Sequence, residues 1–125
     1  MPKGTIVGLC IGVAAMTAAG AAAAKDGDVR VRGTCTQAST VKLKLSDEDG
    51  RIEAEAEVDQ NRNGVSWNVE ISRNGTVVAR TTAVTQPPSG SFEVRRVISN
   101  APGPDTVSVL ATSPSGERCT ARATF

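Results

Sequence analysis

The sequence predicts an all-β protein: a single antiparallel β-sandwich of seven to eight strands, immunoglobulin-like, with one disulfide and an N-terminal signal peptide. Three observations support this prediction. Short segments alternate apolar and polar residues, turn residues separate them at intervals of roughly eight to twelve positions, and one pair of cysteines lies near the two ends of the predicted domain. A small closed barrel is the alternative architecture.

Residues 1–24 have the features of a secretory signal peptide. Lys3 is the one cation near the start, an apolar run extends from Ile6 to Met16, and Ala22–Ala24 ends the segment with an A-x-A cleavage pattern. Cleavage after Ala24 removes Cys10 and leaves residues 25–125 as one β-sandwich domain. An uncleaved membrane anchor is the alternative, since the apolar stretch is nearly long enough to span a bilayer.

The predicted mature segment is electrically neutral. The chain holds 14 Lys and Arg and 13 Asp and Glu, and Lys3 is the only charged residue before position 25, so 13 charges of each sign remain. A nucleic-acid-binding surface requires an excess of positive charge or a basic block. The composition therefore predicts no nucleic-acid partner, and no membrane contact after signal cleavage.

Within each predicted strand, apolar and polar residues alternate with a period of two, which places one face of the strand in the core and the other in water. The third of them is rich in Ala and Glu, which favour helices, but its apolar residues form a single row only in a strand. Trp67, Phe92 and Phe125, the only aromatic residues, are predicted to be core residues. The predicted strands cover residues 29–35, 41–45, 52–58, 67–72, 76–84, 92–98, 106–112 and 117–125.

Turn residues predict how these strands are connected. Asn63-Gly64 and Asn74-Gly75 are strong two-residue hairpin signals, so the middle of the chain is predicted to be a β-meander. Asp47–Gly50 is predicted to be a four-residue turn that places Leu45 opposite Ile52. In that register, oppositely charged side chains face each other on the solvent side of the hairpin.

Cys35 and Cys119 are predicted to form the disulfide. Even numbers of cysteines in exported proteins are typically paired, because the extracellular environment is oxidising. The alternation places both side chains on the inner face of their strands. The bond then ties the first and last strands of the domain together.

Several segments carry a resemblance to a known group of proteins. These are Arg32–Cys35, Lys42–Ser46, Asp59–Gly64 with the following Trp67, Arg73–Ala79, Gly90–Val94 and the late Cys119. The chain resembles small secreted actinobacterial (Streptomyces-like) proteins of unknown function over nearly its whole mature length. The resemblance implies a secreted, extracellular or cell-wall-associated protein with a sandwich fold, and it implies no activity.

The composition argues against an enzyme. Histidine and tyrosine are absent, and the mature cysteines are predicted to be oxidised, so the usual general bases and thiolate nucleophiles are missing. No phosphate-binding or dinucleotide glycine motif occurs. We therefore expect no catalytic residues and no cofactor.

One segment matches a calcium-loop pattern. Asp59, Asn61 and Asn63 alternate before a glycine, and Glu70 follows six residues after that glycine. The flanking segments are predicted strands, whereas the calcium loop of this pattern joins two helices. A turn in which Asp59 and the asparagines support the backbone explains the same residues. The sequence therefore favours no metal site.

The leading functional hypothesis is a secreted, non-enzymatic binding module that acts through its loops as a monomer, on an extracellular protein or an envelope component. The candidate loops are Asp47–Gly50, Gln86–Ser91 and Asn100–Asp105. A structural component of the cell envelope is one alternative. A secreted protease inhibitor or a small-molecule carrier is another.

Overall fold

The computed structural model describes residues 27–125, and the predicted signal peptide with Cys10 lies outside these residues. The described part contains nine strands and no helix. No helix that is long and apolar enough to cross a membrane occurs in residues 27–125. The strands are β2 (Val29–Arg32), β3 (Thr34–Cys35), β4 (Thr40–Glu48), β5 (Arg51–Asp59), β6 (Ser66–Arg73), β7 (Thr76–Val84), β8 (Ser91–Ile98), β9 (Thr106–Thr112) and β10 (Arg118–Thr124).

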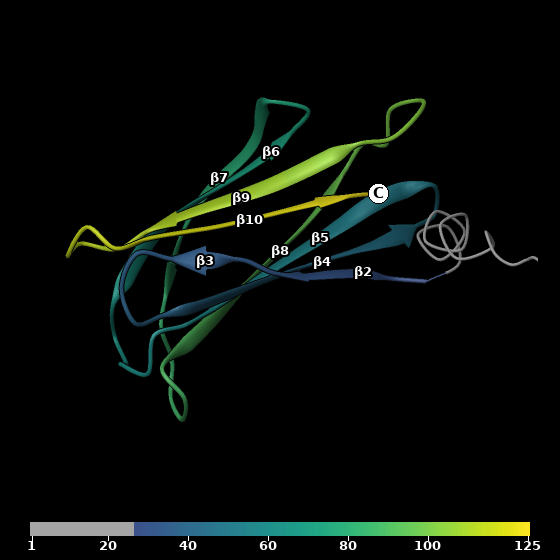
Figure 1. The fold of residues 1–125 in the computed structure, drawn as a ribbon. Helices are drawn as coiled ribbons and strands as arrows, with labels where there is room; N and C mark the ends of the chain where they lie inside the picture. Colours follow the sequence, from purple (N-terminus) through teal and green to yellow (C-terminus); the bar gives the residue numbers. More distant parts are fainter. Residues whose placement is uncertain (1–26) are drawn as a thin grey trace, which may run out of the picture.

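The strands form two antiparallel sheets that pack face to face (Figure 1). The four-stranded sheet has the order β2-β4-β5-β8, and the five-stranded sheet has the order β3-β10-β9-β6-β7. This arrangement confirms the predicted all-β antiparallel sandwich. The disulfide joins β3 and β10, which are neighbours in one sheet, whereas the disulfide of antibody domains joins the two sheets.

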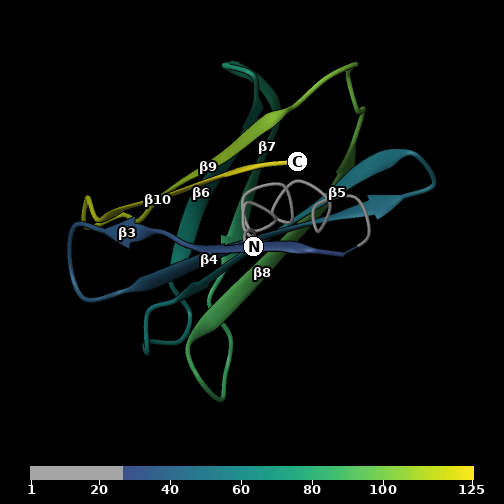
Figure 2. The same ribbon diagram turned by 45° about the vertical axis from the view of Figure 1, so that its right-hand side comes forward.

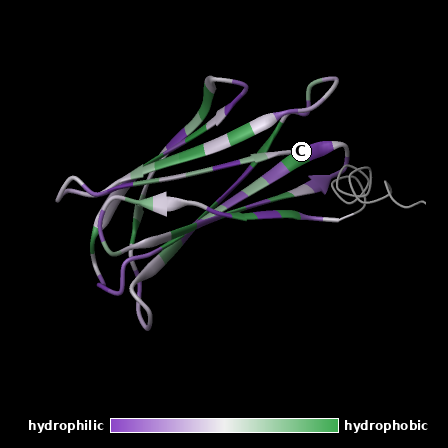
Figure 3. Ribbon diagram, viewed as in Figure 1, coloured by the Kyte–Doolittle hydropathy of each residue, from purple (hydrophilic) through white to green (hydrophobic). Residues whose placement is uncertain are grey.

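The core lies between the sheets and is formed by the inward-facing row of each strand. Figure 3 shows the alternation of apolar and polar residues along the strands that produces these rows. Trp67 is fully buried, and its ring centroid lies 6.0 Å from that of Phe92. Both residues are therefore in the core, as predicted, while Phe125 is only partly buried and packs against its margin.

The predicted first strand is in fact two strands that belong to different sheets. β2 pairs with β4, and β3 pairs with β10. Between them, a Cβ atom on Gly33 would lie 2.0 Å from the carbonyl oxygen of Thr120. Only glycine allows the chain to pass this close to β10 as it changes sheets. The division at Gly33 explains why nine strands form instead of seven to eight.

The predicted hairpin at Asn63-Gly64 is wrong. β5 belongs to the four-stranded sheet and β6 to the five-stranded sheet, so this segment crosses between the sheets. A type I′ turn requires positive φ at both central residues, but Gly64 has φ 77° and Asn63 is not among the residues with positive φ. The Gly64 N–H instead donates to the carbonyl of Thr85 on the next crossing segment.

The second Asn-Gly prediction is confirmed. Asn74 and Gly75 have φ values of 50° and 85°, and Arg73 lies opposite Thr76 across the two-residue turn. The β4–β5 hairpin differs from the prediction, because Asp49 and Gly50 adopt the same positive-φ turn in place of a four-residue turn. Its strands are therefore longer than predicted.

The longer hairpin moves the charge pairs by two residues. Leu45 lies opposite Ala54, not Ile52, and Lys44 lies opposite Glu55, with 3.1 Å between Nζ and Oε1. A shift of two residues keeps every side chain on its own face. For this reason the alternation alone does not distinguish the two registers.

Candidate binding groove on the five-stranded sheet

The three loops that the sequence singles out do not share one surface. Asp47–Gly50 precedes β5 and Asn100–Asp105 follows β8, and these strands are antiparallel neighbours, so both loops lie at one end of the sandwich. Gln86–Ser91 precedes β8 and lies at the other end. Figure 2 shows the β7–β8 loop at the bottom of the view and the β8–β9 loop at the top. The three loops therefore cannot contact one ligand together.

The Asn100–Asp105 loop is held by a buried carboxylate. Asp105 is fully buried, and its oxygens accept hydrogen bonds from Asn74 Nδ2 at 2.9 Å and from the Ala101 N–H at 3.1 Å. Asn74 also accepts a hydrogen bond from the Thr106 N–H. These contacts fasten the loop to the β6–β7 turn, so its polar residues are committed to structure.

The Gln86–Ser91 loop is held by the segment between β5 and β6. The Gln60 N–H donates to the Gly90 carbonyl at 3.0 Å, and a Cβ atom on Gly90 would lie 2.2 Å from the backbone nitrogen of Arg62. Thr85, which is buried, accepts a hydrogen bond from the Val65 N–H. The two crossing segments thus brace each other.

One residue of the calcium-loop pattern, Glu70, lies away from the other three. The Asp59 carboxylate accepts a hydrogen bond from the Asn61 N–H at 3.1 Å, which is the turn geometry that the alternative explanation requires. Glu70 lies on the outer face of β6, four residues into the strand, or about 13 Å from its start. There its carboxylate is paired with Arg80 at 3.1 Å. Glu70 therefore does not join the other three residues.

The outer face of the four-stranded sheet carries a network of charges that pair with one another. A groove of about 460 Å³ is lined by Arg30, Arg32, Lys42 and Lys44 together with Glu55 and Glu57. Lys44 pairs with Glu55, which also pairs with Arg95 at 3.0 Å. Arg32 and Lys42 belong to no ion pair among the described residues, but Glu57 lies directly opposite Lys42, so acidic and basic side chains are mixed on this face.

Two neighbouring carboxyl groups on this face have pKa values shifted in opposite directions. Hydrogen bonding with the Glu93 carboxyl, followed by that with Arg95, lowers the pKa of Glu55 to about 2. The same contact with Glu55 raises the pKa of Glu93. As the pH rises, Glu55 is therefore the first of the two to ionise and Glu93 the second.

This pair predicts a specific pH dependence of stability. The lowered pKa of Glu55 contributes stability above its unfolded value of 4.5, which is lost as the pH falls toward 2. The raised pKa of Glu93 acts in the opposite direction, since its contribution is complete below 4.5 and is lost as the pH rises. Glu93→Gln keeps a hydrogen-bond donor and removes the charge. We expect it to raise the free energy of unfolding at pH 7, and with it Tm, by roughly 0.5 kcal/mol or less in free energy because the side chain is exposed.

Thermal unfolding measured from pH 3 to pH 8 checks this expectation. The gain of Glu93→Gln should vanish near pH 3, where the wild-type carboxyl is protonated. Glu48→Gln, at the exposed end of β4, is the matched control and should show no such dependence. An equal gain for Glu93→Gln at both ends of the range would contradict the raised pKa of Glu93.

The outer face of the five-stranded sheet carries a groove with a volume of about 600 Å³. This volume lies within the range of ligand sites, and the groove is open to solvent. Its lining is mainly polar and comes from four neighbouring strands. The hydroxyl groups are those of Thr34 on β3, Thr120 on β10, Ser108 on β9 and Ser72 on β6.

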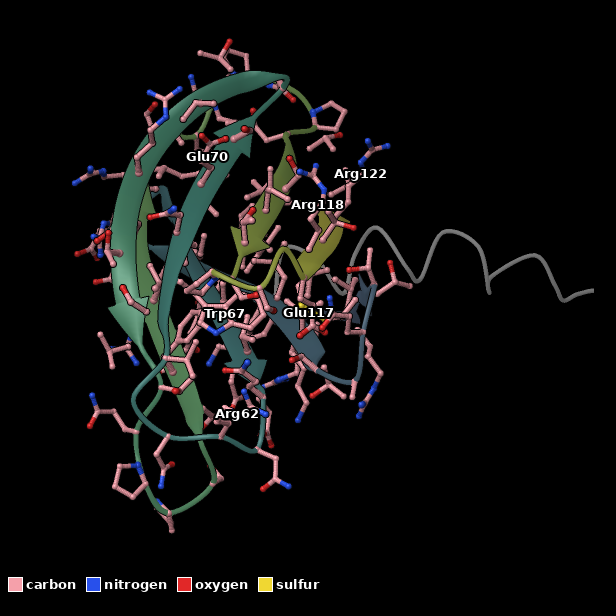
Figure 4. All side chains as sticks on the ribbon, turned by 90° about the vertical axis from the view of Figure 1, so that its left-hand side faces the viewer. Arg62, Trp67, Glu70, Glu117, Arg118 and Arg122 are labelled. Carbon is pink, nitrogen blue, oxygen red and sulfur yellow. A yellow bond between two sulfur atoms is a disulfide. The ribbon has the colours of Figure 1, made fainter. Side chains whose placement is uncertain are left out.

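Two arginines give this groove its charge. Arg118 and Arg122 both face outward on β10, four residues and therefore about 13 Å apart (Figure 4). Neither takes part in an ion pair among the described residues. Glu70, the acid in the lining, is paired with Arg80. The groove therefore has two cations whose charges are not neutralised by the protein.

The part of β10 that carries Arg118 is held rigidly. Cys119 is buried and bonded to Cys35, with 4.0 Å between the Cα atoms. The Arg118 N–H donates to Thr36 Oγ1, and the Thr36 N–H donates to the Arg118 carbonyl, both at 2.9 Å. These bonds fix the backbone on both sides of the arginine, so its side chain projects from a defined position.

Glu117 completes this support. It is buried, and its carboxylate accepts hydrogen bonds from Ser39 Oγ at 2.7 Å and from the N–H groups of Ser39 and Gln37. Its oxygens and the sulfurs of Cys35 and Cys119 lie within 4.8 Å of one another. Because the sulfurs are bonded to each other and the carboxylate is occupied by the loop, this cluster serves the structure.

The alternation of β10 marks Arg118 and Arg122 as outward-facing, but it does not mark them as a site. An arginine on a strand can be neutralised by acids on a neighbouring strand, as Arg95 is by Glu53 and Glu55 on the other sheet. Only the sheet order shows that β10 lies between β3 and β9, whose outward residues are hydroxyls and Leu110, with no acid among them. The groove therefore could not be predicted from the sequence alone.

No protein-family model matches the chain, and comparison with curated proteins gives no significant match. The groove on the five-stranded sheet and the residues that line it are therefore the basis for the function proposed below.

Proposed function

We propose that this protein is a secreted, non-enzymatic binding module, and that the groove on the five-stranded sheet holds an extended polyanionic ligand of the cell envelope. The observation that carries this proposal is the pair of unneutralised arginines on β10 within a groove of about 600 Å³. A disulfide in a small domain supports an oxidising, extracellular location.

The chemistry of the groove favours a chain with repeated anionic groups. Two arginines whose backbone positions are about 13 Å apart suit two carboxylate or phosphate groups of one polymer, and guanidinium forms charge-assisted hydrogen bonds with both. The hydroxyls between them, including those of Thr120 and Ser108, can donate to or accept from the polar groups that separate the charges. No aromatic residue lines the groove, so stacking on neutral sugar rings is not part of the proposed recognition.

Titration with defined polymers tests the proposal. The probes are an oligomer of glutamate, an oligomer of glycerol phosphate and neutral dextran, each followed by isothermal titration calorimetry at low ionic strength. We expect at least one polyanion to bind and dextran not to bind. Arg118→Ala/Arg122→Ala should weaken polyanion binding about tenfold, which corresponds to about 0.7 kcal/mol for each exposed contact. Higher salt should weaken it further.

Arg30→Ala/Arg32→Ala is the matched control, because it removes the same two charges from the outer face of the other sheet. It should leave the affinity within about twofold. Equal losses in the two double variants would show that polyanions are attracted by overall charge, and the groove would then have no special role. Absence of binding for both polyanions would refute the ligand class.

A further inference from the structure

β7 is an edge strand whose outer side has no neighbouring strand in residues 27–125. An edge of this kind leaves a row of backbone N–H and C=O groups available for pairing with another chain. Proteins normally protect long edges with charges, proline or short strands. The other long edge, β8, carries Glu93, Arg95 and Arg96.

β7 lacks most of these protections. It is nine residues long, contains no proline or lysine, and has Arg80 as its only charge, which is paired with Glu70. A bulge at Val78 interrupts the pairing with β6, and the strand is regular from Ala79 to Val84. Val78 and Val84 are the two large hydrophobic side chains that the described residues leave exposed, at 37% and 42%.

The spacing of these valines is self-complementary. Thr81 lies three residues from each of them. If two copies of β7 pair antiparallel about a two-fold axis at Thr81, Val78 of each copy lies opposite Val84 of the other on the outer face. Arg80 lies opposite Thr82, so no two arginines face each other directly. A register shifted by two residues loses both valine pairs, because the two pairs are related by the two-fold axis.

We propose that β7 pairs with β7 of a second copy of this chain in that register. The pairing satisfies the free backbone groups of both edges and buries the two valine pairs. The two five-stranded sheets become one ten-stranded sheet. Because the axis is perpendicular to the sheet, both outer faces, and hence both grooves, lie on the same side.

The interface is small, and this sets the expected affinity. Seven residues of edge bury less area than the about 800 Å² per partner of a standard interface. We therefore expect a reversible dimer whose population rises with concentration between about 10 µM and 1 mM.

Sedimentation velocity of the purified, oxidised protein over this range tests the proposal. Val78→Lys/Val84→Lys places lysine opposite lysine in the proposed register and should raise the dimer dissociation constant at least tenfold. Val78→Lys/Val84→Glu places opposite charges opposite each other and should restore dimerisation. Both variants change exposed side chains, and circular dichroism verifies that they fold. Val97→Lys, on the edge of the other sheet, should leave the constant unchanged.

A cysteine scan tests the register. Thr81 is the only residue of β7 that lies opposite itself, so Thr81→Cys should form a covalent dimer on mild oxidation, whereas Ala79→Cys should not. A monomer at every concentration up to 1 mM would overturn the proposal, as would a dimer that both charged double variants leave intact. Dimerisation is measured without a groove ligand, so its outcome is independent of the proposed function.

Discussion

Replacing both Cys35 and Cys119 with serine is expected to lower the free energy of unfolding by about 4.5 kcal/mol. The bond closes a loop with a sequence separation of 84 residues, and a loop of this length loses much conformational entropy in the unfolded chain when it is cross-linked. A domain of about one hundred residues has about 5–15 kcal/mol of stability in total. The double variant is therefore expected to be marginally folded at 25 °C.

Urea unfolding at 10 °C and 25 °C, followed by circular dichroism, measures this loss. The wild-type protein in excess dithiol is the matched comparison, because it removes the same bond without a substitution. Both forms should give the same midpoint. A loss below about 1 kcal/mol would show that the hydrogen bonds of Glu117 and Thr36 hold β3 against β10 without the bond.

Replacing Trp67 with alanine is expected to cost about 3–5 kcal/mol. The indole is fully buried between the sheets, lies 6.0 Å from the ring of Phe92, and donates a hydrogen bond from Nε1 to Gln60 Oε1 at 3.1 Å. The alanine variant leaves a large cavity and an unpartnered amide oxygen.

Trp67→Phe separates the two contributions, since it keeps an aromatic ring in the core and removes the N–H donor. We expect it to retain more than half of the lost stability, as measured by urea unfolding with an unchanged m value. If Trp67→Ala were nearly as stable as the wild type but failed to bind a ligand, the residue would be a binding platform and its assignment to the core would be wrong.

The sequence predicts most of the fold because most strands have one solvent-exposed face and one buried face. The rows formed by Val41 to Leu45 and by Cys119 to Ala123 need no knowledge of their neighbours to be recognised. The inward orientation of both cysteines follows from the same alternation, and the structure confirms the bond between them.

The errors occur where the chain changes sheets. Asn63-Gly64 and Asn74-Gly75 have the same two residues at the turn, yet one crosses between the sheets and the other closes a hairpin. The difference depends on Thr85, which holds the crossing segment through the Gly64 and Val65 N–H groups. A turn motif carries no information about a partner twenty residues away.

The sequence by itself determined the fold class, the inner and outer face of most strands, and the pair of cysteines, because each depends on a local period or on composition. Only the tertiary structure decided which strands are neighbours. That order places Arg118 and Arg122 between two strands, β3 and β9, that carry no acid on their outer faces, and it leaves β7 at an edge. The physical reason is that sheet order is set by packing and backbone pairing between distant segments, which a local pattern does not encode.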